Sequence, residues 1–157
     1  MRKTVIDPVA PRVSQPEQEW LDIEELAKIE VTSEDPNFPI ESALSSRTGQ
    51  GWRAAKRGSQ IIRIIFDKPR QLHRIRLEFC ETEMERTQEF TLRWSADPAR
   101  PFKEIVRQQW NFSPQGSTSE VEDYQLELNG VSVLELALKP DLTPDNAFAT
   151  LAMWRMA

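Results

Sequence analysis

The sequence of 157 residues contains one cysteine, Cys80, and one histidine, His73. A single thiol cannot form an internal disulfide, and it excludes a metal site built from several thiolates. A chain without disulfides suits a reducing compartment, so the sequence favours a cytoplasmic location. Cys80 ends an apolar stretch beside Glu81, and we interpret it as a buried, unreactive thiol. His73 has no catalytic pattern around it, and we interpret it as structural.

The sequence also lacks long apolar runs. No stretch of 18 apolar residues occurs, and no continuous apolar segment follows the two early cations of the N-terminus. We therefore expect neither a membrane span nor export. With 25 acidic and 20 basic residues the net charge is -5, which argues against a broad nucleic-acid surface and leaves room only for a local basic patch.

Familiar catalytic signatures are missing as well. The sequence holds no G-x-S-x-G elbow, H-E-x-x-H zinc helix, G-x-x-x-x-G-K-S/T phosphate loop or EF-hand series. We predict that the protein is not an enzyme and that it needs no cofactor. The sequence leaves one enzymatic scheme open, a glycosidase with two carboxylates, because its acidic residues offer many pairs.

What the sequence does contain is alternation of apolar and polar residues with period two. Ile62, Ile64 and Phe66 flank the charged Arg63, and the same pattern recurs down the chain. Segments rich in turn residues, such as 66–69, 95–98 and 128–130, separate the repeats. The strands that we expect cover residues 27–33, 62–66, 75–79, 90–94, 104–112, 124–128, 134–138 and 148–155.

Eight strands with one apolar face each must bury those faces against one another. We therefore predict an all-β fold, an eight-stranded antiparallel jelly-roll β-sandwich over residues 20–157. Residues 1–19 carry Pro8, Pro11 and Pro16, which remove backbone donors and favour extended conformations. We interpret this segment as an extended, proline-rich N-terminal arm.

The order of these segments is similar to that of a known family. A first strand, a long excursion with a tryptophan, a Gln-led aliphatic strand and a closing strand resemble the discoidin, or F5/8 type C, group of galactose-binding-like domains. The similarity covers Leu26 to Arg155. The segments that carry it are residues 29–34, Gly51-Trp52, 60–67 with Pro69, 75–77 and 149–155.

A second similarity points the same way. Residues 86–90 and 107–114 resemble a bacterial branch of unassigned proteins, some of them labelled carbohydrate-binding. The resemblance implies a non-catalytic binder of sugars, lipid headgroups, proteins or nucleic-acid structures. Some relatives hold calcium near the first long loop, where Glu34, Asp35 and Asn37 are the candidate ligands. Secreted relatives often close their terminal strands with a disulfide, which this chain cannot do.

The segment from Ser42 to Phe66 contains five basic residues and no acidic one. A tryptophan face beside guanidinium groups suits a sugar ring, a nucleobase or an acidic group. Alternatively, the acidic side chains of the 80–88 connection pair with these cations across one end of the sandwich, and the tryptophan fills the core. The candidate ligand-binding residues are Arg47, Trp52, Arg53, Lys56 and Arg57.

Three functions are consistent with this sequence. The first is recognition of a carbohydrate or similar polar ligand by loops at one end of the sandwich. The second is a protein-protein interaction subunit of a cytoplasmic assembly that uses the N-terminal arm and an exposed sheet face. The third and least favoured is binding of single-stranded nucleic acid by the basic segment.

Overall fold

The computed structural model describes residues 3, 20–45, 50–143 and 146–157. Within this part of the chain, neither of the two four-residue helices could cross a membrane. The predicted arm lies outside the described residues except for Lys3, so its boundary stays a prediction. The elements are α2 (Ile23–Leu26), β1 (Ala27–Val31), α3 (Glu41–Leu44), β2 (Trp52–Arg57), β3 (Gln60–Cys80), β4 (Arg86–Ser95), β5 (Lys103–Phe112), β6 (Ser119–Lys139), β7 (Phe148–Leu151) and β8 (Met153–Met156).

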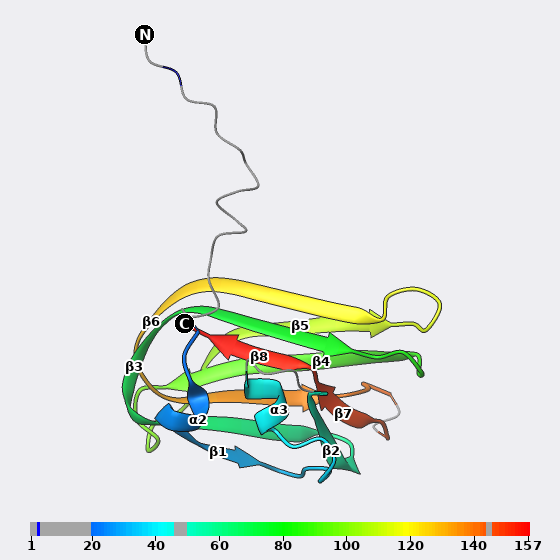
Figure 1. Cartoon of the computed structure of the whole chain (residues 1–157), viewed down its shortest axis with the longest axis horizontal. Coiled ribbons are helices and arrows are strands. Elements are labelled where there is room, and N and C mark those ends of the chain that lie inside the picture. The colour runs from blue at the N-terminus through cyan, green and yellow to red at the C-terminus, as the bar shows by residue number, and fades with distance from the viewer. Residues whose placement is uncertain (1–2, 4–19, 46–49, 144–145) are drawn as a thin grey trace.

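Two strands of 21 residues, β3 and β6, form the frame of the molecule. They pair antiparallel over most of their length, with Ile62 opposite Leu136 near one end and Phe79 opposite Glu120 near the other. Both ribbons turn back together, so that each contributes one half to each layer of the sandwich (Figure 1). The register shifts in the bend that follows Ile65.

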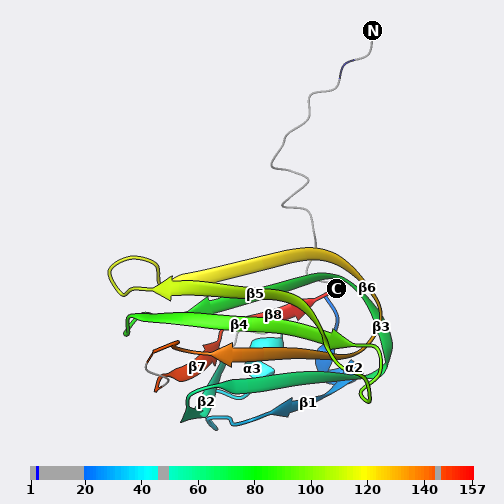
Figure 2. The same ribbon diagram turned by 180° about the vertical axis from the view of Figure 1, so that it is seen from behind.

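The remaining strands attach to this frame. One layer has the order β1-β3-β6-β4-β5, and β8 joins the other half of β3 with Trp154 opposite Leu77. Strands β2 and β7 form a separate two-stranded sheet at one end of the sandwich. Figure 2 shows the layer of β4, β5 and β6 from its outer side.

The core lies between the two layers because every second side chain of the long strands points inward. Ile62 and Ile64 are fully buried in one half of β3, as are Ile75 and Leu77 in the other. The rings of Phe79 and Phe90 stack across the interior with centroids 5.3 Å apart. Burial of each such side chain contributes about 1.5–3 kcal/mol, so this alternation is the main source of stability. The predicted antiparallel β-sandwich is confirmed.

The strand boundaries differ from the prediction. The segments 66–69 and 128–130, predicted to be turns, lie inside β3 and β6, whose pairing resumes with Arg70 opposite Val131. Pro69 lacks a backbone donor and Gly130 has φ 73°, so both distort the ladder without ending it. The predicted turn at 95–98 is confirmed. The long excursion expected between the first strand and the Gln-led strand contains α3 and β2.

Gly51, just before β2, allows that strand to approach β7. Its φ is +79°, a value that side chains with a Cβ rarely adopt. A Cβ at this position would lie 2.5 Å from the backbone oxygen of Leu151 and 2.9 Å from the Cα of Ala152. Glycine is therefore required where β2 meets the end of β7.

We expect Gly51→Ala to lower the free energy of unfolding by about 1–3 kcal/mol, because strain and a backbone clash add together. Gly116→Ala is the matched control, since a Cβ there meets only Ser113 side-chain atoms at 3.7 and 3.8 Å. That variant should stay within about 0.5 kcal/mol of the wild type. Urea unfolding measures both, and equal stability of the two variants would contradict the close approach.

Candidate functional site

A hollow of about 280 Å³ opens where β2, β7 and the connection after β3 meet. These elements lie at the right-hand end of the sandwich in Figure 1. We call it the end hollow. The side chains that matter most in its wall are Arg53, Arg57, Glu83, Met84, Phe148 and Thr150.

An irregularity in the β2–β7 pairing brings two arginines to one ring. Arg53 lies opposite Thr150 and Arg57 opposite Phe148, so three residues of β2 face a single residue of β7 between these pairs. Such bulges shorten the distance along one strand and redirect its side chains. The Cζ of Arg53 is 4.8 Å and that of Arg57 is 5.2 Å from the centroid of the Phe148 ring.

The positive charge of this pair is not neutralised within the described part of the chain. No carboxylate there lies within ion-pair distance of Arg53 or Arg57. Glu81, one of the acidic residues of the 80–88 connection, instead accepts a 2.7 Å hydrogen bond from Nε of Arg86. The alternative in which acidic side chains of the 80–88 connection pair with these arginines is therefore not observed among the described residues.

The role predicted for Trp52 requires correction. Its side chain is only 1% exposed, and its Nε1 donates a 3.1 Å hydrogen bond to the carbonyl of Ser33. Successive residues of a strand point to opposite faces, so Trp52 enters the core while Arg53 faces the end hollow. The indole therefore anchors β2, as our alternative interpretation had it, and offers no face to a ligand.

The other predicted binding residues separate into three groups. Arg53 and Arg57 meet at the end hollow, where a binding role stays a prediction. Lys56 is exposed but does not line the hollow. Arg47 lies outside the described residues.

Sequence reasoning missed three residues of the hollow. Phe148 was assigned only to a closing strand, although it is half-buried and carries both arginines. Met84 is a large hydrophobic side chain that is 37% exposed. It stands between acidic residues in the sequence, and this single apolar residue in an acidic segment was the signal that could have identified it. Cys80 was expected to be buried, yet its thiol is exposed and lines the hollow, because the last residue of β3 points away from the core.

A second hollow of about 280 Å³ lies on the outer face of the larger layer. Ile61, Ala137 and Thr91 lie side by side across three strands and form its floor. The small side chain of Ala137 at the middle of this row leaves a shallow trough. Charged residues, among them Glu89, Arg93 and Arg107, also line this trough.

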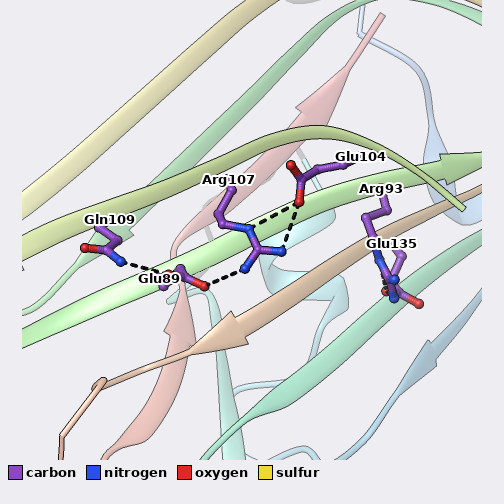
Figure 3. Close-up of polar contacts among 6 residues, drawn as sticks. All are labelled: Glu89, Arg93, Glu104, Arg107, Gln109 and Glu135. Carbon is purple, nitrogen blue, oxygen red and sulfur yellow. Dashed lines mark hydrogen bonds and ion pairs between the residues drawn. The ribbon is translucent and has the colours of Figure 1, made fainter.

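The charges around this trough pair within the protein, as Figure 3 shows. Arg107 donates to Glu89 at 3.3 Å and to Glu104 at 3.0 Å, and Gln109 donates to Glu89 at 2.9 Å. Because these groups satisfy one another, the trough has fewer donors left for a ligand than the end hollow.

The most deeply placed acid of this face is Glu135, whose side chain is fully buried. Arg63 donates to its Oε2 at 2.8 Å, and Nε of Arg93 donates to its Oε1 at 2.9 Å. A buried carboxylate is stable only when such partners replace water. Glu135 is therefore a structural ion and not a free acid.

A chain of buried polar groups runs inward near the end hollow. Arg86, with a fully buried side chain, donates to Gln88 at 3.1 Å, and Gln88 donates to Glu120 at 3.3 Å. Burial, together with a hydrogen bond and charge repulsion from Glu122, raises the pKa of Glu120 to about 8, although Gln88 and Arg86 act in the opposite direction. Glu120 is therefore protonated in the folded protein at neutral pH. Tyr124 donates to Glu122 at 3.2 Å on the same strand.

We expect the stability of the protein to fall as pH rises between about 4.5 and 8. In this window the unfolded chain releases the Glu120 proton while the folded chain keeps it, so raising the pH favours unfolding. Glu120→Gln keeps the shape and the neutral state, and its stability relative to wild type should increase with pH. Urea unfolding at pH 5, 7 and 9 measures this. Glu127→Gln on the exposed side of β6 is the control, and parallel pH curves for Glu120→Gln and wild type would contradict the buried acid.

Two of the calcium ligands implied by the family resemblance accept hydrogen bonds from nearby backbone amides. Glu34 Oε1 accepts a 2.6 Å hydrogen bond from the amide of Ile40, and Asp35 Oδ1 accepts one of 2.9 Å from the amide of Asn37. Among the described residues no group of three or more His, Cys, Asp or Glu side chains is placed to hold a metal ion. Calcium binding at this loop stays a prediction.

Comparison with known proteins bears on the fold. No protein-family model matches the sequence, and no curated protein matches it either. Solved structures do resemble it. The family 32 carbohydrate-binding module of NanJ from C. perfringens, in complex with galactose, is similar over 87% of this chain and 96% of its own, with TM-score 0.62 and 12% identity.

Two further structures extend this likeness. A family 32 module from a family 31 glycoside hydrolase of Clostridium perfringens matches 88% of this chain and 94% of its own, with TM-score 0.63 and 18% identity. A truncated AlyQ with CBM32 and alginate lyase domains matches 83% of this chain with TM-score 0.60 and 14% identity, but the chain spans only 31% of that protein. The chain therefore has the β-sandwich fold of the family 32 carbohydrate-binding modules, the galactose-binding-like fold that the sequence resemblance predicted.

Proposed function

We propose that the protein is a non-catalytic module that binds a carbohydrate in the end hollow. The observation that carries this proposal is the convergence of Arg53 and Arg57 on Phe148 at the open end of a β-sandwich. Guanidinium groups supply several directed donors for ring oxygens, and apolar side chains supply contact for C–H faces. Glu83 and Thr150 in the same wall add acceptors for sugar hydroxyls.

The structural neighbours support the same function. The NanJ module of the same fold was solved with galactose bound, and it matches nearly its whole length to this chain. A shared fold alone does not transfer a ligand, because function resides in the site. The support comes from the combination of this fold with a hollow that carries donors, acceptors and apolar surface.

The carboxylates of the end hollow favour binding over hydrolysis there. A glycosidase places two carboxylic groups on either side of the scissile bond. The described wall of the end hollow contains two acidic residues, Glu81 and Glu83. Glu81 accepts a hydrogen bond from Arg86, and Glu83 is the remaining acid. Elsewhere Glu89 and Glu135 are bound by arginines. Because Glu81 is bonded to Arg86, the described wall of the end hollow offers no free pair of carboxylates, which supports binding over hydrolysis at this place.

The two alternative functions have no specific observation in their favour. A role for the N-terminal arm in protein binding involves residues outside the described part of the chain. The basic segment proposed for nucleic acid is divided by the structure, since Arg63 is bonded to Glu135 and Trp52 is buried. The cytoplasmic location also stays a prediction, based on the sequence alone.

Titration calorimetry against a panel of oligosaccharides tests the proposal. We expect at least one sugar to bind, and Phe148→Ala to weaken that binding about 2- to 10-fold, the range set by the loss of one aromatic contact. Phe102→Ala is the matched control, because Phe102 also lies under an arginine, Arg93 at 5.2 Å, but follows β4 at the opposite end of the sandwich.

The control variant should bind as the wild type does. Absence of binding across a panel of neutral, amino and acidic sugars would refute a carbohydrate function. Equal losses in Phe148→Ala and Phe102→Ala would place the binding site elsewhere.

A further inference from the structure

We propose that the ligand of the end hollow is an acidic sugar whose carboxylate lies between Arg53 and Arg57. This inference rests on the proposed function and adds the chemical class of the ligand. It comes from the way in which this protein uses its other arginines.

Five arginines of the described residues lie over an aromatic ring. In three of the four ring sites, the arginine also forms an ion pair with a carboxylate of the chain. Each such site consists of a ring, a guanidinium and an acid. The three complete sites are Trp20, Arg74 and Asp123, with a 2.9 Å hydrogen bond; Phe112, Arg86 and Glu81, with one of 2.7 Å; and Phe102, Arg93 and Glu135, with one of 2.9 Å.

The fourth ring, Phe148, carries two guanidiniums and no carboxylate among the described residues. Two cations over one ring repel each other, and the ring quadrupole offsets only part of that repulsion. An external anion between them would complete the arrangement that the chain itself completes at the other three rings that lie under an arginine. The position of the anion is open to solvent because Arg53 is half-buried and Arg57 is exposed beside the hollow.

The shape of the acceptor follows from the donors. A guanidinium presents parallel N–H groups that match the two oxygens of a planar carboxylate. Glu83, which also lines the hollow, disfavours a ligand with two negative charges, but it can accept a hydrogen bond from a hydroxyl group. Met84 and Phe148 add apolar contact for a ring face. One carboxylate on a hydroxylated ring, as in a uronic acid, satisfies all of these groups.

The decisive experiment compares sugars that differ only at C6. Galacturonate and glucuronate oligosaccharides are titrated beside the neutral galactose and glucose oligosaccharides of equal length, and a galactose 6-sulfate oligosaccharide tests a different oxyanion. We expect the uronates to bind roughly tenfold more tightly than the neutral sugars, as expected for one added charge-assisted hydrogen bond. This preference should decrease as NaCl is added, because salt screens partly exposed charges.

Charge-removing variants locate the effect. Arg53→Gln and Arg57→Gln should each lower the affinity for uronates several-fold more than they lower the affinity for neutral sugars, and the double variant should remove the preference. Arg100→Gln is the matched control, because it removes one exposed positive charge, 79% accessible, outside the end hollow. It should bind uronates as the wild type does.

Cys80 provides a local readout of occupancy. It is the only cysteine of the chain, and it is exposed in the wall of the end hollow. A bound uronate should slow alkylation of the Cys80 thiol, and the neutral sugar at equal concentration should slow it less. Unchanged circular dichroism of each variant shows that a loss of binding is not a loss of folding.

The outcomes distinguish failure of the acidic-ligand proposal from failure of the proposed carbohydrate-binding function. If neutral and acidic sugars bind equally and both protect Cys80, the carbohydrate function stands and the acidic ligand is refuted. Tighter binding of the sulfated sugar than of both uronates would refute a carboxylate. Uronate binding that neither protects Cys80 nor responds to the two arginine variants would place the site elsewhere and refute both. No binding of any sugar would refute the function itself.

Discussion

The antiparallel pairing of β3 with β6 is the constraint on which the rest of the structure depends. Both strands continue through a bend, so one ladder of hydrogen bonds contributes to both layers and fixes how they face each other. Strands β1, β4 and β8 extend this ladder at its free edges. The end of β3 at Cys80 and the start of β4 at Arg86 then determine where the connection beside the end hollow begins and ends. The position of the candidate site is thus a consequence of the length of two strands.

The fold class could be predicted from the sequence because period-two alternation reports which side chains are buried. The continuity of β3 and β6 could not, since Pro69 and Gly130 give the same local signals in a bend as in a chain reversal. What distinguishes the two cases is whether the partner strand also continues, and this information lies about 60 residues away in the chain, as the pairing of Arg70 with Val131 shows. The same limit explains the long loop expected before Gln60. The apolar residues of β2 are too few for alternation to indicate a strand.

The candidate site was predicted in part, and the errors of that prediction have a common physical origin. Counting the basic residues between Ser42 and Phe66 identified a segment rich in cations, yet it treated Arg63 and Arg53 alike. Arg63 is neutralised by Glu135, a residue 72 positions further along the chain, whereas Arg53 has no carboxylate partner among the described residues. Trp52 and Arg53 are adjacent in sequence and point to opposite faces. A local charge count contains neither cross-strand partners nor side-chain direction, so it could find the neighbourhood of the site but not its composition.

The location of the arginines on a strand has a consequence for recognition. A side chain on a free loop loses rotamer freedom when it binds, which costs about 1.5–2 kcal/mol for an arginine that becomes fully fixed. Arg53 and Arg57 are already restricted, because β2 pairs with β7 and the Phe148 ring holds both guanidiniums in the free protein. For the proposed ligand, part of the ordering cost would therefore be met during folding and not during binding. Trp52 contributes to the same effect from the other face of β2, since its burial and its hydrogen bond to Ser33 fix the strand that carries the arginines. The buried indole thus positions its neighbour Arg53 at the end hollow.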